Sequence, residues 1–332
     1  MDILSDDPVT DRIRASLLAG AIGDALGAPV EFHTIGRIRA RHGVHGLRDY
    51  VPAYGRRGAV TDDTQMTLFT AEGLLEALRA PDSAPGGAID AAYRRWLRTQ
   101  RTPFPGAGRE SGLLAEAALW ATRAPGHTCL SALANPGRGL GERADNNSKG
   151  CGGVMRVAPI GLCRRVGDPF ALASAAARLT HNHPSGYLAA AAFALLVRRL
   201  LDGEALRDAL AVTLDRLAGE PGHEETTAAL LQARALAEAG GPATPERLMQ
   251  LGGGWVAEEA LAIALWCALV APDLESALLL AINHDGDSDS TGSLTGNLLG
   301  AALGMAAIPA RWLADLELRE CIVRVADELA AT

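Results

Sequence analysis

Two acidic clusters, far apart in the chain, contain the residue types that bind divalent cations. The first reads Thr-Asp-Asp-Thr-Gln at residues 61–65, and the second reads His-Asp-Gly-Asp-Ser-Asp-Ser at residues 284–290. In each, aspartates and hydroxyl groups stand where a loop enters an expected helix. Carboxylate and hydroxyl oxygens are the donors that hard cations such as Mg²⁺ prefer. If the two helices pack side by side, the clusters form one site, and one or two cations would offset the repulsion between carboxylates.

Taken separately, each cluster has a simpler interpretation. Asp62 could cap a helix that begins at Asp63, with Gln65 completing a capping box. The second cluster could be a solvated acidic turn. It resembles a calcium loop but lacks the bidentate glutamate at the twelfth position. A shared metal site is favoured because a cap needs only one carboxylate, and because Asp287 and Asp289, two residues apart in extended backbone, point the same way.

A third polar segment, at residues 146–153, reads Asn-Asn-Ser-Lys-Gly-Cys-Gly-Gly. Consecutive glycines let backbone N–H groups approach an anion such as a pyrophosphate, and Lys149 and Arg156 would add positive charge. The segment matches neither the phosphate loop of NTPases nor the dinucleotide fingerprint, and alone it would indicate a plain loop. Glu31 and His181 also stand out, although a surface glutamate and a capping or core histidine are the commoner outcomes.

Helices must position these groups, since Ala and Leu dominate the chain while aromatic residues make up 4% of it. Asp7 and Pro8 begin a first helix, and a second is expected at 63–79. Further helices are expected at about 89–99, 111–121, 169–180, 185–201, 203–218, 224–239, 244–250, 255–270, 273–281, 290–306 and 311–329. The longest stretch without helical period is 125–153, which we expect to be a functional loop.

No period-two strand pattern or internal repeat is present. We therefore predict an all-α protein, a compact orthogonal many-helix bundle that forms a single domain over residues 1–332, with residues 1–7 flexible.

Glycines predict that two of these helices pack closely. Four recur at every fourth position near the C-terminal end of the chain: Gly292, Gly296, Gly300 and Gly304. Each glycine inside a helix costs about 1 kcal/mol relative to alanine, so a stripe of them indicates backbone approach by a neighbour. The expected partners lie in the first helix: Gly20, Gly23 and Gly27. This packing would bring the acidic clusters together.

Charge and cysteine content exclude several classes of protein. A formal net charge of −8 argues against non-specific coating of nucleic acid, but it leaves room for a small anionic substrate. The five cysteines form no Cys-x-x-Cys pair, and no signal-peptide pattern is present, which predicts free thiols in the cytoplasm. The apolar runs at 188–197 and 260–271 are too short to span a bilayer, so no membrane role is expected.

In order along the chain, these motifs resemble the ADP-ribosylglycohydrolase family, which includes dinitrogenase-reductase-activating glycohydrolases and ADP-ribosylarginine and ADP-ribosylserine hydrolases. The resemblance extends from about residue 10 to residue 306. The matching segments are Gly-Asp-Ala-Leu-Gly at 23–27 with Glu31, Thr-Asp-Asp-Thr-Gln-Met at 61–66, Gly-Gly-Val-Met-Arg at 152–156, Thr-His at 180–181, Trp-Val-Ala-Glu-Glu-Ala-Leu at 255–261 and Gly-Asp-Ser-Asp-Ser at 286–290.

The resemblance implies an all-α fold with two divalent cations, Mg²⁺ or Mn²⁺, in a cleft. By position, the metal ligands would be Thr61, Asp62, Asp63, Asp287, Asp289 and Ser290. The residues that hold ADP-ribose would be Ser148, Gly150, Cys151, Gly152, Gly153 and His181. Glu31 falls where the family has a mobile glutamate beside the metals, and Glu31, Asp62 and Asp63 would be the catalytic residues. Either Glu31 or a ligating aspartate could act as the general base.

The function that the resemblance implies is hydrolysis of the glycosidic bond between ADP-ribose and a modified macromolecule. We favour arginine-linked ADP-ribose on protein, although nucleic acid is not excluded. The alternatives are a non-catalytic ADP-ribose-binding or crystallin-like structural member and a metal phosphohydrolase. The chain departs from the family pattern at Cys151, where many members carry asparagine, at Ser290, where threonine is usual, and at 284–285, which replace a glycine-rich lead-in. Ser290 keeps a hydroxyl ligand and is tolerated, while the other two departures bear on substrate preference rather than on catalysis.

Overall fold

α-Helices make up nearly all of the regular secondary structure. The computed structural model describes residues 7–80 and 84–332, within which there are sixteen α-helices and no β-strand. The α-helices are α1 (Pro8–Gly27), α2 (Ile35–His42), α3 (Asp62–Arg79), α4 (Pro85–Arg101), α5 (His127–Ala134), α6 (Ala158–Leu162), α7 (Pro169–Arg178), α8 (Pro184–Leu201), α9 (Leu206–Ala218), α10 (Glu224–Glu238), α11 (Pro245–Leu248), α12 (Ala257–Val270), α13 (Leu274–Ala281), α14 (Ser288–Leu303), α15 (Ala310–Asp315) and α16 (Arg319–Ala330). Short 3-10 helices cover Gly112–Ala115, Ala117–Leu119, Cys151–Gly153, Met249–Leu251 and Met305–Ala307. The predicted all-α bundle is confirmed.

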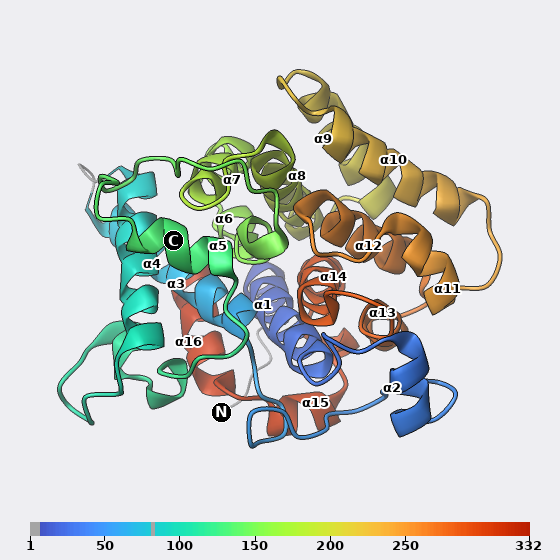
Figure 1. Cartoon of the computed structure of the whole chain (residues 1–332). Helices are drawn as coiled ribbons and strands as arrows, with labels where there is room; N and C mark the ends of the chain where they lie inside the picture. The colour runs from blue at the N-terminus through green and yellow to red at the C-terminus, as the bar shows by residue number, and fades with distance from the viewer. Residues whose placement is uncertain (1–6, 81–83) are drawn as a thin grey trace.

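Helices α1 and α14 lie side by side at the centre of the bundle (Figure 1). A Cβ atom placed on Gly292 would lie 2.5 Å from the carbonyl oxygen of Gly23, and one on Gly23 would lie 2.1 Å from the carbonyl oxygen of Gly292. Gly296 faces the Ala19 carbonyl oxygen in the same way, at 2.0 Å. Gly300 likewise faces the Ala15 carbonyl oxygen, at 2.4 Å, so the expected backbone approach is confirmed for the first three glycines of the stripe. Gly304 lies outside it, because this residue ends α14 with a φ of +77°.

The start of α3 differs from the predicted one. Thr61, not Asp62, caps this helix, and its hydroxyl oxygen accepts from the amide of Asp63 at 3.3 Å. Gln65 completes no capping box, because its side-chain amide donates instead to the carbonyl oxygen of Ala121. A hydroxyl cap leaves the carboxylates of Asp62 and Asp63 available for another purpose.

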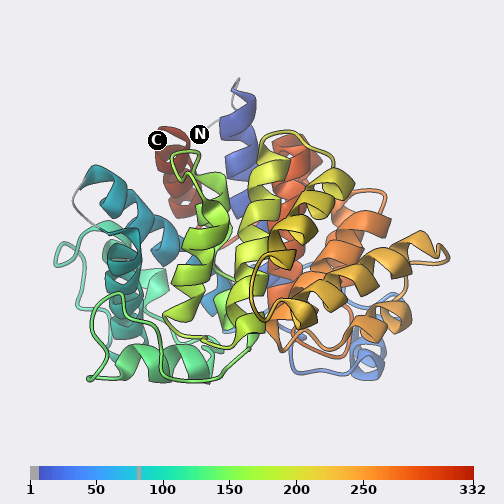
Figure 2. The same cartoon turned by 90° about the horizontal axis from the view of Figure 1, so that it is seen from above.

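The remaining helices enclose the central pair. Figure 2 shows α7, α8 and α14 side by side, with α9 and α10 outside them. Among the described helices, α8 alone is long and apolar enough to cross a membrane, and 72% of it is buried inside the protein. Burial of this kind is typical of a core helix, since an apolar helix must cover its surface with other elements.

Several predicted boundaries were wrong. The helix expected at 111–121 is two 3-10 turns, and the expected loop at 125–153 contains α5. The segment 311–329 is divided into α15 and α16 by Leu318, whose φ of +59° is left-handed. Helix α2 was not predicted, because it is polar and buries only Ile38. The predicted flexibility of residues 1–7 falls largely outside the described residues, and Asp7 caps α1 as expected.

We predict that Gly292→Ala lowers the free energy of unfolding by about 1–3 kcal/mol or more, because the added methyl group collides with backbone rather than with a movable side chain. Urea denaturation would measure this change. The matched control is Gly36→Ala in the exposed helix α2, where the nearest atom to the new Cβ is the Thr34 hydroxyl oxygen at 4.0 Å. The control should be neutral or stabilise by up to about 1 kcal/mol. Equal stability of the two variants would contradict the close packing.

Candidate active site

The two acidic clusters meet at the N-terminal ends of α3 and α14. Asp62 and Asp63 form the first turn of α3, while Asp287 caps α14 and Asp289 lies in its first turn. All four carboxylates are buried. Burial raises the pKa of Asp62, Asp63 and Asp287, and the next largest cause in each case is the negative charge of Asp289. Asp289 therefore lies close to the others, so the structure brings the two predicted clusters into one site.

Glu31 joins this site from the turn that follows α1. One carboxylate oxygen of each of Glu31, Asp287 and Asp289 lies within 4.8 Å of the others. Burial, followed by the charges of Asp289 and Asp287, raises the pKa of Glu31 to about 11. The buried Oε2 atom of Glu31 has no hydrogen-bond partner. Glu31 is thus not the surface glutamate that its sequence position alone would suggest.

Asp24, in the last turn of α1, is a site residue that the sequence reasoning missed. Its carboxylate accepts hydrogen bonds from the amides of Thr61 (3.0 Å) and Thr64 (3.1 Å). It therefore fixes the start of α3, which carries Asp62 and Asp63. Burial, and then the charge of Asp289, raise the pKa of Asp24 to about 7. The available signal was a single carboxylate within the apolar stretch 17–27 of this helix, since such groups are rarely buried without a role.

The charge of this site has no protein counter-ion. None of the ion pairs within residues 7–80 and 84–332 includes any of its six carboxylates: Asp24, Glu31, Asp62, Asp63, Asp287 and Asp289. Besides the Oε2 atom of Glu31, the buried Oδ1 atom of Asp63 also has no partner. Buried anions require a partner, and oxygen donors with unused lone pairs fit a hard divalent cation. Thr61 and Ser290, both buried, lie beside the aspartates and add hydroxyl oxygens.

The glycine-rich segment forms a second wall of the site. Backbone hydrogen bonds hold it against the segment before α12, from the Cys151 amide to the Trp255 carbonyl oxygen (3.2 Å) and from the Ala257 amide to the Lys149 carbonyl oxygen (2.9 Å). The Cys151 thiol donates to Oδ2 of Asp287 at 2.7 Å. This contact joins the predicted substrate loop to the carboxylates.

His181 packs against the same glycine-rich segment. A Cβ atom on Gly152 would lie 3.0 Å from Cε1 of His181, and one on Gly150 would lie 3.4 Å from Nε2. The Ser148 hydroxyl oxygen accepts from the Gly150 amide at 3.4 Å. The predicted ADP-ribose-binding residues Ser148, Gly150, Cys151, Gly152, Gly153 and His181 therefore lie together. Their role in binding stays a prediction.

The two basic side chains that were expected to bind an anion here, Lys149 and Arg156, already have partners within the protein. Lys149 forms ion pairs with Glu225 (2.8 Å) and Glu258 (2.5 Å). Arg156 is fully buried and donates from Nη2 to the hydroxyl oxygen of Thr180 at 2.6 Å. Both side chains thus have partners within the protein, and the contribution of their charge to anion binding stays a prediction.

A chain of polar contacts links Arg156 to His181. The Thr180 hydroxyl, which accepts from Arg156, lies 2.8 Å from Nδ1 of His181. Burial, and then the positive charge of Arg156, lower the pKa of His181 to about 3. The imidazole is therefore neutral at physiological pH.

Aromatic side chains border the carboxylates. Phe32, next to Glu31, stacks on Trp255 with the ring centroids 5.8 Å apart and the planes at 20°. Phe32 is 70% exposed and Trp255 is 45% exposed. Tyr54 is also 45% exposed. Burial, and then the charge of Glu31, raise its pKa above the usual range. Exposed aromatic rings thus lie beside an anionic site.

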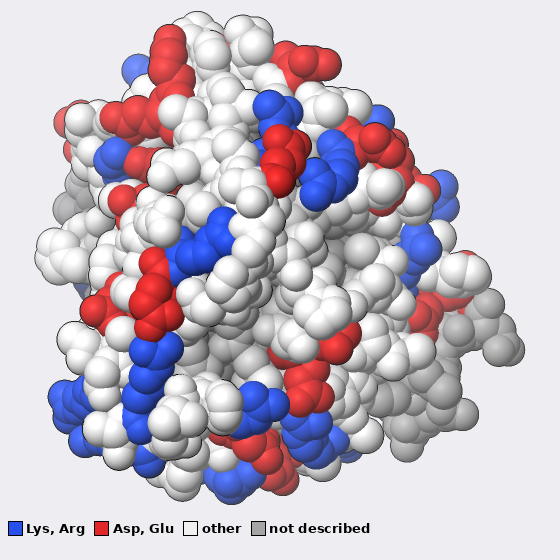
Figure 3. Space-filling model, turned by 90° about the vertical axis from the view of Figure 1, so that its right-hand side faces the viewer, with Lys and Arg blue, Asp and Glu red and all other residues white. Residues whose placement is uncertain are grey.

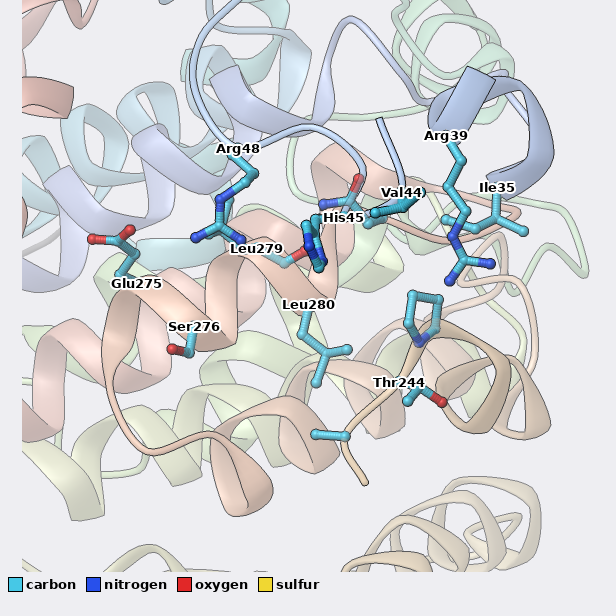
Figure 4. A pocket seen from close by; sticks show the side chains of 13 residues that line it. Ile35, Arg39, Val44, His45, Arg48, Thr244, Glu275, Ser276, Leu279 and Leu280 are labelled. Carbon is cyan, nitrogen blue, oxygen red and sulfur yellow. The ribbon is translucent and has the colours of Figure 1, made fainter. Parts of the chain in front are cut away.

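A separate cavity lies elsewhere on the molecule. It has a volume of about 360 Å³ between α2 and α13, and its lining includes Arg39, His45 and Arg48 (Figure 4). None of the predicted site residues lines it. The face seen in Figure 3 mixes Lys and Arg with Asp and Glu and has no continuous basic area. Neither feature supports a nucleic-acid-coating surface.

The fold and this site define an all-helical protein with a buried carboxylate centre at two helix N-termini. The sequence model of the ADP-ribosylglycohydrolase family matches residues 5–332, so the chain belongs to this family. The resemblance seen in the sequence is confirmed. The protein is a hydrolase that acts on linkages to ADP-ribose.

Similar proteins cover almost the full length of the chain. ADP-ribosyl-[dinitrogen reductase] glycohydrolase of Rhodospirillum rubrum is 28% identical, over 94% of this chain and 92% of its own. Human ADP-ribosylhydrolase ARH3 is 29% identical, over 92% and 89%. ADP-ribosylarginine hydrolase Tri1 of Pseudomonas putida is 25% identical, over 98% and 80%. A solved structure, an ADP-ribosylglycohydrolase-related protein complex, is 29% identical with a TM-score of 0.72 and covers 97% of this chain and 98% of its own.

We predict that Asp63→Asn stabilises the protein in EDTA while weakening the stabilisation that Mg²⁺ gives. Neutralising one buried carboxylate removes repulsion, so the melting temperature in EDTA should rise by about 1–2 °C for each kcal/mol gained. Thermal unfolding with and without Mg²⁺ would measure both effects. Asp215→Asn, at an exposed position in α9, is the control and should change neither. A fall in the melting temperature of Asp63→Asn in EDTA would contradict uncompensated charge at this site.

Proposed function

We propose that this chain hydrolyses the glycosidic bond between ADP-ribose and an arginine side chain of a modified protein, in a reaction that depends on Mg²⁺ or Mn²⁺. One observation carries the proposal. Buried carboxylates without a counter-ion lie beside a glycine-rich segment and a neutral histidine, and the Cys151–Asp287 contact connects the two parts. Membership of the family supports the class of reaction, and these groups would hold the cations and the substrate.

The cations would be held by the six residues that the sequence predicted: Thr61, Asp62, Asp63, Asp287, Asp289 and Ser290. Two buried oxygen atoms without partners, on Asp63 and Glu31, are the structural support for a resident cation. When bound, a divalent cation orients ribose hydroxyls and lowers the pKa of water. Asp24 would act through the other residues, because it positions the α3 terminus and faces no open space.

Glu31 is assigned the role of general base. It lies on a turn rather than within a helix, and one of its oxygens has no partner. Burial and the neighbouring negative charges raise its pKa, so it could accept a proton from an attacking water once a bound cation offsets those charges. Cleavage at the anomeric carbon passes through an oxocarbenium-like state, which nearby carboxylates such as Asp62 and Asp63 stabilise. Ser148, the glycine amides and His181 would hold the ADP-ribose by hydrogen bonds. The five free cysteines agree with the proposed cytoplasmic location.

The choice of arginine as the target rests on the aromatic residues beside the acidic site. A guanidinium group is planar, always charged and stacks on aromatic faces. The exposed stack of Phe32 and Trp255, next to Glu31, offers such a face together with negative charge. A serine-linked substrate would gain neither contact.

We expect Mg²⁺-dependent release of free ADP-ribose from arginine-linked substrate, and loss of release in EDTA. Asp289→Ala should lower kcat/KM at least about 100-fold, which exceeds the 10- to 100-fold loss typical of residues that only orient a metal ligand. Asp215→Ala is the matched control. Serine- and DNA-linked substrates, assayed in parallel, test the choice of target. Release of phosphate instead of ADP-ribose would identify a phosphohydrolase, and near-native activity of Asp289→Ala would exclude the proposed metal site.

We further expect Trp255→Ala to raise KM for the arginine-linked substrate by about 2- to 30-fold with little effect on kcat. This range corresponds to the 0.5–2 kcal/mol of a cation–π contact. Steady-state kinetics would show it, with Leu140→Ala, another exposed apolar position, as the control. An unchanged KM would argue against arginine recognition by this stack.

A further inference from the structure

We propose that the Cys151 thiol is a sulfur donor within the cation site, so that this chain binds thiophilic cations such as Cd²⁺ and Zn²⁺ through sulfur as well as oxygen. The inference rests on the divalent-cation site of the proposed function. It adds a donor that the six predicted ligands do not include.

The sulfur lies against one of the predicted ligands, Asp287. Sγ of Cys151 is 2.7 Å from Oδ2 of Asp287. The thiol also interacts with the side chain of Ser290 and with the charge of Asp63. Cys151 begins the short 3-10 helix Cys151–Gly153, whose backbone is fixed by the hydrogen bond to Trp255. The sulfur is thus held at the carboxylates by the fold.

Other features of the same site indicate that it binds a cation. The Oδ1 atom of Asp63 and the Oε2 atom of Glu31 are buried without a partner, and both residues are more than nine-tenths buried. The Asp287 carboxylate, which accepts from the thiol, is also within reach of Glu31 and Asp289. A cation bound by these oxygens would therefore lie next to the sulfur.

The chemistry of the donor atom determines which cations bind more tightly. Thiolate is a soft ligand that favours Zn²⁺ and similar ions, whereas Mg²⁺ prefers oxygen. On binding, the bond from sulfur to hydrogen breaks and a bond from sulfur to the metal forms, and the proton leaves to solvent. The hydrogen bond to Asp287 is lost at the same time, which frees that oxygen for the metal. No oxidant or reductant is needed.

Cys151 can be followed separately from the other thiols. It is half-buried, while Cys129, Cys163, Cys267 and Cys321 are buried. A thiol-alkylating reagent should therefore react first at Cys151 in the folded protein. A cation bound to the sulfur would block that reaction.

The experiment is a titration of the metal-free protein with Cd²⁺, followed by ultraviolet absorption and by calorimetry. We expect a sulfur-to-cadmium charge-transfer band that saturates at about one thiolate per chain. In Cys151→Ser the band should be lost and the Kd for Cd²⁺ should rise by about 10- to 100-fold, while Cys129→Ser should keep the band. Absence of the band in the native protein despite calorimetric binding would overturn the inference and leave the oxygen site intact. Absence of any cation binding would overturn both.

If Cys151→Ser fails to fold, the Cys151→Asn variant and alkylation of the native protein test the same proposal. The asparagine variant should bind Mn²⁺ but show no cadmium band, and a band in this variant would exclude Cys151 as its source. In the native protein, Cd²⁺ should slow alkylation of Cys151 at least about 10-fold, whereas Mg²⁺ at equal occupancy should slow it less. Equal protection by the two cations would show that sulfur is only a neighbour of the metal and would overturn the proposal.

Discussion

The contact between the bare backbones of α1 and α14 sets the distance between the end of α1, which leads to Glu31, and the carboxylates at the start of α14. Gly23 and Gly292 each face the carbonyl oxygen of the other, and Gly27 faces the backbone of Ser288. Because α1 ends at Gly27, the turn that carries Glu31 emerges beside the first turn of α14. A side chain at any of these positions would move the two helices apart, and the cluster of Glu31 with α14 would separate with them.

This arrangement costs stability, because like charges lie close together in a buried place. The N-termini of α3 and α14 offset part of the cost, since the positive end of a helix dipole and its free amides favour nearby carboxylates. Asp24 shows most clearly how the cost of burying a carboxylate is partly offset. It is fully buried, yet it gains hydrogen bonds from Thr61 and Thr64 that fix the end of α3. A bound cation would supply the remaining compensation, so the stability of this fold and its proposed catalysis depend on the same charges.

Structural features that depend on apolar periodicity and residue type could be predicted from the sequence. The all-α fold, the approach of α1 to α14 and the meeting of residues 61–63 with 287–290 could all be inferred from local patterns. Asp24 could not, because its role depends on contact with a segment 37 residues away. The choice of Thr61 over Asp62 as cap, and the pairing of Lys149 with Glu225 and Glu258, are likewise set by tertiary neighbours. Helix α2 was missed because a polar helix that buries one side chain has no apolar period.

The link from Arg156 through Thr180 to His181 decides which nitrogen of the imidazole carries its proton. A guanidinium can only donate, so the Thr180 oxygen accepts there. The single hydroxyl proton of Thr180 then has Nδ1 of His181 at 2.8 Å as a closer acceptor than the Ala177 carbonyl oxygen at 3.4 Å. Nδ1 is then an acceptor, and the one hydrogen of the neutral ring belongs to Nε2, which faces the glycine-rich segment. His181 is thereby fixed as a donor in one tautomer. It can bind the oxygen of a phosphate or a ribose but not a group that only donates, and a change of pH within the physiological range leaves that preference unaltered.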